Sequence, residues 1–173
     1  MELLPYGDRA PAPGSASLLD LDNFPLGGLQ HAEPTVQGGR ASLEYIQRAV
    51  REVMDGRLDA LVTAPISKEA IGAAGSPHAG HTEMLGELTG TARPVMLLVR
   101  HTLRVAFATT HLALRDVADA LTSEGISHTG CMLADGLRRY FGVDEPRIAV
   151  CALNPHAGDG GRFGDEEGRL VAP

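Results

Sequence analysis

Hydrophobic and polar positions alternate along this chain with two different periods, which predicts helices and strands in succession. From 43 to 54 apolar residues recur at three- and four-residue spacing, which predicts a helix with Ser42 as a nearby cap and Gly56 at its end. A second helical pattern covers 126–141 and stops at a glycine, and a short one covers 116–121. These segments supply the predicted helical layer.

Short apolar runs between the helices predict strands. They lie at 59–65, 95–100, 103–110 and 147–153, and residues 166–171 begin a further helix. The last run is continuously apolar, which is typical of a strand buried on both faces. The middle two are joined so tightly that we expect a mixed sheet. Strands that alternate with helices predict the α/β class.

The first 39 residues have a different character from the rest. They are rich in Pro, Gly and Ala, which predicts an irregular or extended segment that needs other structure to pack against. Residues 40–173 form the expected α/β portion. With 173 residues in all, the chain is long enough for one domain with a hydrophobic core and too short for two full-sized ones.

Composition narrows the classes of function. The net charge of -7 disfavours nucleic acid as a partner, although a small phosphorylated ligand needs only a few local donors. No apolar run is long enough to cross a bilayer, and residues 1–7 lack the pattern of a signal peptide, so we expect a cytoplasmic protein. Cys131 and Cys151 lie in apolar stretches, which predicts buried free thiols.

Two histidines follow predicted strands, and neutral imidazole is a common ligand of transition metals. His111 comes after Thr-Thr and His156 after Asn-Pro. For either one alone, a capping or surface role is the better interpretation, and finding both in the same context shifts the balance only modestly. No HExxH or paired-cysteine pattern supports a metal site, so the residues leave both interpretations open.

A third polar segment opens a predicted helix. Thr82 could simply cap it, with Glu83 in the first turn, or His81 and Thr82 could bind a phosphate or carboxylate at the helix N-terminus. For Lys68, the sequence favours neither a solvated lysine at a helix start nor a lysine that contacts phosphate over the other. The glycine-rich loop after His156 matches neither GxGxxG nor a P-loop. The remaining histidines are interpreted as structural or solvent-facing: His31, His78, His101 and His128.

Four segments together carry a family resemblance. In order they are Thr-Ala-Pro-Ile-Ser-Lys at 63–68, Gly-His-Thr-Glu at 80–83, Ala-Thr-Thr-His-Leu-Ala-Leu-Arg-Asp-Val at 108–117 and Leu-Asn-Pro-His-Ala-Gly-Asp-Gly-Gly at 153–161. They resemble the 4-hydroxythreonine-4-phosphate dehydrogenase family of pyridoxal phosphate (vitamin B6) biosynthesis. The match runs from about Leu43 to the C-terminus.

The resemblance implies the isocitrate/isopropylmalate dehydrogenase-like fold, with two α/β lobes, a cleft between them and a homodimer. It implies NAD-dependent oxidation of 4-phosphooxy-L-threonine, followed by loss of carbon dioxide. His111 and His156 match two metal ligands of the family, and His81 and Thr82 match substrate-binding positions. A divalent ion (Zn, Mg or Co) would lower the pKa of the substrate hydroxyl.

The departures from the family pattern predict an incomplete chain. Family members are about twice as long, and this chain lacks both their Gly-(Asp/Glu)-Pro-Ala-Gly-Ile-Gly-Pro segment and the Tyr-His-Asp-Gln-Gly segment with the third metal histidine. We therefore expect an underliganded metal site, exposed sheet edges and little turnover by this chain alone.

Three alternatives stay open at this stage. Close relatives oxidise other four-carbon phosphorylated acids, such as phosphoerythronate or phosphothreonate. The chain could also be a non-catalytic fragment that binds metal or phosphate. A metal-dependent hydrolase is a weaker possibility, because it needs a general base and nothing singles one out among Asp116, Asp159 and Glu83.

Overall fold

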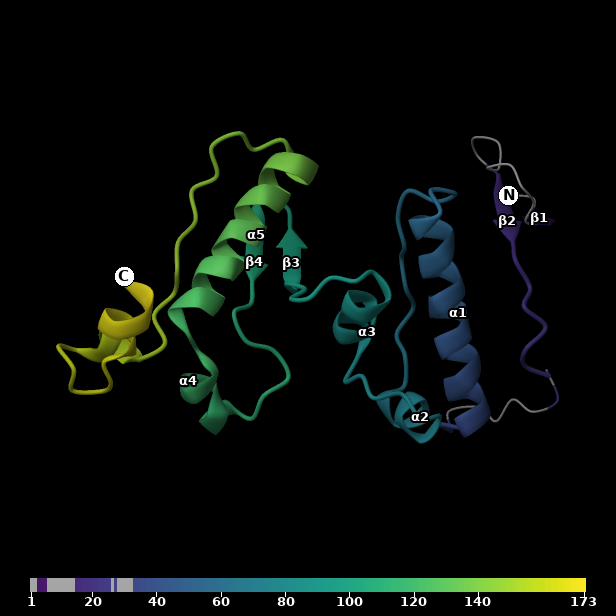
Figure 1. Cartoon of the computed structure of the whole chain (residues 1–173), viewed down its shortest axis with the longest axis horizontal. Coiled ribbons are helices and arrows are strands. Elements are labelled where there is room, and N and C mark those ends of the chain that lie inside the picture. The colour runs from purple at the N-terminus through teal and green to yellow at the C-terminus, as the bar shows by residue number, and fades with distance from the viewer. Residues whose placement is uncertain (1–2, 6–14, 26, 28–32) are drawn as a thin grey trace. The chain divides into compact units, whose positions relative to one another are not determined.

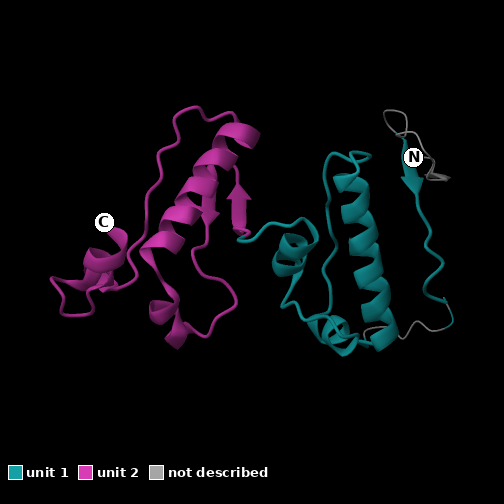
Figure 2. Ribbon diagram, in the orientation of Figure 1, with its two compact units in different colours: residues 1–93 teal, residues 94–173 magenta. Residues whose placement is uncertain are grey.

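The computed structural model describes residues 3–5, 15–25, 27 and 33–173, so His31 and much of the N-terminal segment lie outside the described residues. The chain forms two compact units, residues 1–93 and 94–173 (Figure 2). Each unit contains its own helices and one pair of strands (Figure 1). No helix within the described ranges is both long enough and apolar enough to cross a membrane.

The first unit is built around one long helix. Strands β1 (Leu3–Pro5) and β2 (Ala16–Leu18) pair in parallel, and helix α1 (Val36–Met54) follows. The helix starts earlier than predicted, because Thr35, not Ser42, caps it by accepting a hydrogen bond from the Gly38 N–H at 3.0 Å. Two glycines in its first turns carry no apolar signal and have low helix propensity, which concealed this start from the sequence pattern.

Two short helices pack on α1. They are α2 (Lys68–Ala73) and α3 (His81–Leu88). Their shared core consists of Ile46, Val50, Ile71 and Met84. At the crossing with α2, a Cβ added to Gly39 would collide with the carbonyl of Ala70. This glycine therefore allows the backbones of α1 and α2 to meet directly.

Near the end of α1 a buried carboxylate is held by two arginines. Glu52 is only 2% exposed, and its oxygens lie 2.6 Å from Nε of Arg48 and 2.6 Å from Nε of Arg57. Burying a charge is costly unless it is paired, and these arginines provide the pairing. The ion pairs tie the turn after α1 back onto the helix.

The second unit combines a β-hairpin with one long helix. Strands β3 (Leu97–Arg100) and β4 (Leu103–Ala106) pair antiparallel, which confirms the predicted tight connection. A 3₁₀ turn, η2 (Leu114–Asp116), leads into α4 (Val117–Ala120). Helix α5 (Ser123–Phe141) ends at Gly142, whose φ of 65° is left-handed, as its predicted stop requires.

Two of the predicted strands are not formed. The segments 59–65 and 147–153 are extended, but neither belongs to a sheet within the described residues, and the two sheets found there have two strands each. The prediction of one mixed sheet was therefore wrong, whereas the α/β class is confirmed. A strand needs a hydrogen-bonded neighbour, and these segments have none there. Val62 is accordingly 94% exposed.

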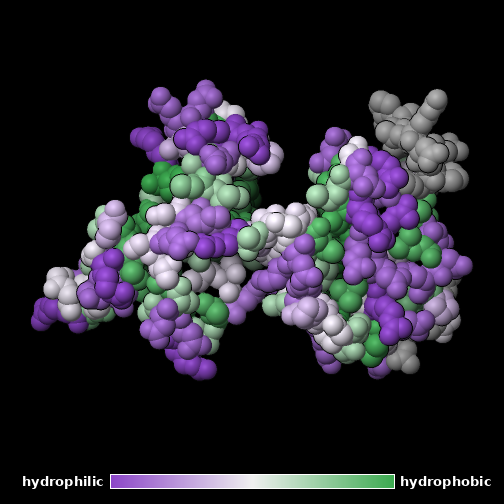
Figure 3. All heavy atoms as spheres, viewed as in Figure 1, coloured by the Kyte–Doolittle hydropathy of each residue, from purple (hydrophilic) through white to green (hydrophobic). Residues whose placement is uncertain are grey.

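The two cysteines are free, as predicted, but the prediction of burial was wrong. Both Cys131 and Cys151 are exposed. The reason for Cys151 is the same as for the missing strand, because it lies in 147–153 and no further strand covers that segment. Apolar surface is visible in each unit, as green areas among the purple hydrophilic ones in Figure 3.

Candidate functional site

In the first unit, the N-terminus of α3 presents His81 and Thr82. Gly80 occupies the cap position with an extended φ of 176°, so of the two interpretations left open by the sequence, the one in which Thr82 caps the helix does not hold. Gly80 has no side chain, and no side-chain hydrogen bond closes this helix end. The first backbone N–H groups of a helix carry partial positive charge, so such an end suits an anion.

Lys68 lies beside the same helix end. It is the first residue of α2, after Ser67, whose hydroxyl accepts a hydrogen bond from the Ala70 N–H at 3.2 Å. The Lys68 Cε lies 3.7 Å from the point where a Cβ of Gly80 would stand. The Glu83 carboxylate lies equally near that point, at 3.7 Å, so opposite charges meet there.

His81 adds a polar atom that the described fold does not satisfy. Its Nε2 is buried and makes no hydrogen bond within the described residues. Buried polar atoms of this kind are uncommon and need an explanation, such as a ligand or water. The imidazole, the Thr82 hydroxyl and the Lys68 ammonium together can supply donors to one small anion.

In the second unit, His156 lies in a left-handed turn. The turn η3 (Pro155–Gly158) gives His156 a φ of 53° and Ala157 a φ of 51°, and Asp159 follows at 45°. Non-glycine residues adopt this region rarely, and they do so at a cost of about 1–3 kcal/mol each when the surroundings impose it. Hydrogen bonds from the Ala157 N–H to the Asn154 carbonyl and from the Asp159 N–H to the His156 carbonyl close the turn.

A carboxylate brace that the sequence analysis missed holds this turn. The Asn154 N–H donates to Oε1 of Glu167 at 2.6 Å. Its Nδ2 donates to Oε2 of Glu166 at 2.6 Å and to Oε2 of Glu167 at 3.1 Å. The backbone and side-chain bonds from Asn154 lower the pKa of Glu167 below its ordinary value of 4.5.

The brace is anchored to the rest of the second unit. Glu167 begins a π-helical turn, η4 (Glu167–Val171), in place of the predicted helix start. The hydroxyl of Ser123, the first residue of α5, donates to the Leu170 carbonyl at 3.0 Å. The sequence signal for this brace is an asparagine directly after an apolar run and a Glu-Glu pair past the glycine-rich loop.

His111 also has left-handed backbone, with φ of 57°, and it is exposed like His156. It lies beyond β4 in irregular chain, because that strand ends at Ala106 and not at Thr110 as predicted. The described residues contain no group of three or more His, Cys, Asp or Glu side chains that could hold a metal. Two imidazoles alone supply fewer ligands than the usual three of a catalytic metal.

Comparison with known families places the chain. The protein-family model described as pyridoxal phosphate biosynthetic protein PdxA matches residues 7–173 of the chain. The chain belongs to this family. The match confirms the resemblance inferred from the four sequence segments, and it begins at residue 7, well before Leu43, where that resemblance begins.

Three relatives illustrate the similarity. The 4-hydroxythreonine-4-phosphate dehydrogenase of Thioalkalivibrio sulfidiphilus is 44% identical over 100% of this chain and 53% of its own. A crystal structure of the Klebsiella pneumoniae enzyme of that name superposes with a TM-score of 0.85 and 38% identity over 99% of this chain and 52% of its own. A relative from Halalkalibacterium halodurans, provisionally named a D-threonate 4-phosphate dehydrogenase, is 40% identical over 92% of this chain and 48% of its own.

This chain therefore spans about half the length of the relatives it matches. Both candidate regions lie inside the matched residues, His81 and Thr82 in the first unit and His111 and His156 in the second. The expectation of a chain shorter than its family is confirmed. The role of each histidine stays a prediction.

Proposed function

We propose that this chain provides about half of a 4-hydroxythreonine-4-phosphate dehydrogenase. The reaction is NAD-dependent oxidation of 4-phosphooxy-L-threonine, followed by decarboxylation, in the biosynthesis of pyridoxal 5'-phosphate. The observation that carries the proposal is the 44% identity to a dehydrogenase of that name along the entire chain. Since the chain spans half of its relatives, turnover requires the remaining polypeptide as well.

His81 and Thr82 are the proposed substrate-binding residues. The uncapped N-terminus of α3 and the unsatisfied Nε2 of His81 support this assignment, because both offer donors to a phosphate or carboxylate. The ammonium of Lys68 beside Gly80 offsets the charge of Glu83 at the same place. An anionic group of the substrate therefore meets a locally neutral cluster rich in donors.

His111 and His156 are the proposed protein ligands of a divalent ion, Zn, Mg or Co. Such an ion would lower the pKa of the substrate hydroxyl and so favour loss of its proton. What this chain contributes is the positioning of one imidazole: the brace from Asn154 to Glu167 keeps the His156 turn folded. A third ligand has to come from polypeptide outside these 173 residues.

The family relationship suggests the rest of the assembly. We propose an isocitrate/isopropylmalate dehydrogenase-like fold for the complete enzyme, a homodimer in the cytoplasm. Within this chain we keep 1–39 as an N-terminal segment and 40–173 as the central portion of the dehydrogenase.

A second substrate is favoured by one specific relative. The protein from Halalkalibacterium halodurans is 40% identical to this chain, and its provisional name refers to D-threonate 4-phosphate. That acid shares a phosphate, a carboxylate and a secondary alcohol with 4-phosphooxy-L-threonine. The donors at His81 and Thr82 can bind groups common to both, so the alternative is a dehydrogenase of a related four-carbon phosphorylated acid.

Metal content tests the ligand assignment on the chain alone. Purified protein is dialysed against Zn, Co or Mg, and bound metal is measured for His111→Ala and His156→Ala. The matched control is His101→Ala, because His101 is exposed and has the same left-handed backbone, with φ of 51°. We expect both ligand variants to lose at least tenfold in affinity for the metal and the control to lose none. Metal bound by both ligand variants with the same affinity as by the wild-type chain would refute the assignment.

Activity then separates an enzyme half from a non-catalytic binding fragment. NAD reduction with 4-phosphooxy-L-threonine or D-threonate 4-phosphate is measured for the chain alone and after addition of the unmatched part of the Thioalkalivibrio relative. We expect NAD reduction only in the mixture of the two polypeptides. A fragment that only binds metal or phosphate would give no NAD reduction, either alone or in the mixture.

A further inference from the structure

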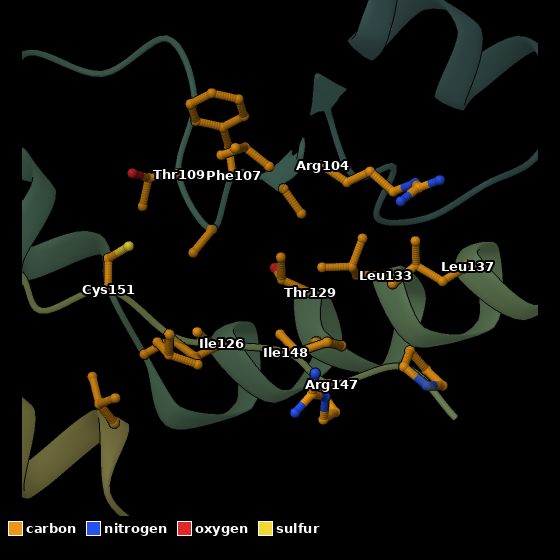
Figure 4. Close-up of a pocket in the computed structure, with 18 of the residues that line it drawn as sticks. Arg104, Phe107, Thr109, Ile126, Thr129, Leu133, Leu137, Arg147, Ile148 and Cys151 are labelled. Atoms are coloured by element: carbon orange, nitrogen blue, oxygen red, sulfur yellow. The ribbon is translucent and has the colours of Figure 1, made fainter. Parts of the chain in front are cut away.

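The second unit contains a cavity of about 710 Å³ that no described element fills. Helix α5 contributes Ile126, Leu133 and Leu137 to its lining. Strand β4 lines one side and the extended segment 147–153 lines another, as the labelled side chains in Figure 4 show. The apolar face of α5 thus has a strand on one side, an extended chain on the other and open space between them.

The edge of β4 that does not face β3 has unused hydrogen-bonding groups. The Phe107 N–H donates to the Met96 carbonyl at 3.1 Å, and the antiparallel register pairs Leu98 with Val105. Hydrogen-bonded pairs alternate along an antiparallel ladder. The N–H and carbonyl groups of Arg104 and Ala106 therefore point away from β3, and no backbone partner meets them within the described residues.

The opposite wall has the same deficiency. Residues 147–153 are extended and join no ladder within the described part of the chain. Ile148 is 38% exposed, Val150 56% and Leu153 36%, although the run has the composition of a strand buried on both faces. Exposed apolar strands with open edges attract a further strand.

We propose that this cavity, called the strand slot from here on, receives a β-strand from the polypeptide that completes the dehydrogenase. An added strand satisfies the outward groups of Arg104 and Ala106 and covers the apolar side chains of 147–153. The occupant follows from length: the chain covers 53% of the Thioalkalivibrio relative, so almost half of such an enzyme lies outside it. The proposal rests on family membership and does not depend on the metal ligands.

Filling the slot converts two isolated pieces into one sheet. β3, β4, the incoming strand and 147–153 become neighbours, with α5 covering one face. Both candidate metal ligands follow the two segments that flank the slot, since His111 lies beyond β4 and His156 beyond the extended segment 147–153. The incoming strand thereby fixes the spacing of the two segments that carry them.

The test uses the full 173-residue chain and the unmatched part of the Thioalkalivibrio relative, produced as a separate polypeptide. Complex formation is followed by light scattering after size-exclusion chromatography, and amide hydrogen exchange is measured by NMR. We expect a one-to-one complex in which exchange at Arg104, Ala106 and 148–152 slows at least about tenfold.

Two variants address the slot and one serves as control. Ala106→Pro removes an N–H that points into the slot and makes no hydrogen bond to β3. Val150→Lys places a charge in the slot. Met132→Lys makes a similar change at a residue of α5 that is 42% exposed and does not line the cavity. We expect at least tenfold weaker association for the first two and unchanged association for the third.

Three results would overturn the proposal. They are absence of a complex with the wild-type chain, a complex in which the slot amides exchange as fast as before, and self-association of the chain that the slot variants abolish. The last would make a second copy of this chain the occupant. None of them affects the metal measurements, which are made on the chain alone.

Discussion

Gly39 offers the sharpest test of the packing that positions the first candidate region. Replacing a helical glycine by alanine favours the helix by up to about 1 kcal/mol. In Gly39→Ala the new Cβ collides with the Ala70 carbonyl, which is backbone and cannot rotate away. Overpacking of this kind typically costs about 1–3 kcal/mol. The net expectation is a loss of up to about 2 kcal/mol in the free energy of unfolding.

The matched controls are glycines of other helices with open surroundings. An added Cβ at Gly72 in α2 or at Gly136 in α5 meets nothing within 4 Å. Gly72→Ala and Gly136→Ala should therefore gain up to about 1 kcal/mol. Urea unfolding followed by circular dichroism measures all three variants. If Gly39→Ala is as stable as the controls, α1 and α2 do not meet through this glycine, and the placement of Lys68 beside Gly80 loses its support.

Two further predictions concern the second unit. The Oγ1 of Thr122 caps α5 by accepting a hydrogen bond from the Gly125 N–H at 3.0 Å. Thr122→Ala should therefore lower the free energy of unfolding, measured in urea, by about 1 kcal/mol, and Thr122→Ser should retain most of the wild-type stability. The pKa of Glu167 is lowered in the folded chain, so its contribution to stability is complete above the ordinary value of 4.5 and disappears as the pH falls through the lower folded pKa. The protection factor of the Asn154 amide, which is its exchange rate in the unfolded chain divided by its rate in the folded chain at the same pH, should therefore be high near about pH 6 and fall under acid. Glu167→Gln should abolish that fall, and a variant whose protection factor still falls under acid as in the wild type contradicts the brace.

The sequence predicted helices well where apolar periodicity and terminal residues agree. Both are present in α5, whose C-terminal Gly142 adopts the left-handed conformation its position suggested. The start of α1 was missed because Gly38 and Gly39 carry no apolar signal, and Gly39 serves a contact with α2 that only the folded chain reveals. The runs 59–65 and 147–153 have the composition of strands, but a strand also needs a neighbour, and composition does not encode one.

For the candidate site, the sequence identified individual residues but not the contacts between them. Motif resemblance selected His81, Thr82, His111 and His156, whereas periodicity and spacing left each of them ambiguous. Lys68 beside Gly80 and the brace on Asn154 depend on contacts between separate segments, so no local pattern contains them.

Left-handed backbone does not by itself identify a functional histidine in this chain. His101, His111 and His156 all have φ between 51° and 57°, yet His101 only turns the hairpin between β3 and β4. His156 differs because Glu166 and Glu167 hold the residue two positions before it through three hydrogen bonds. All members of that brace belong to this chain, so the His156 turn can fold without the strand that we propose for the slot beside 147–153. In the proposed assembly, the completing polypeptide would then align two segments, one of which is already ordered, and ordering fewer residues on association lowers the entropic cost of binding.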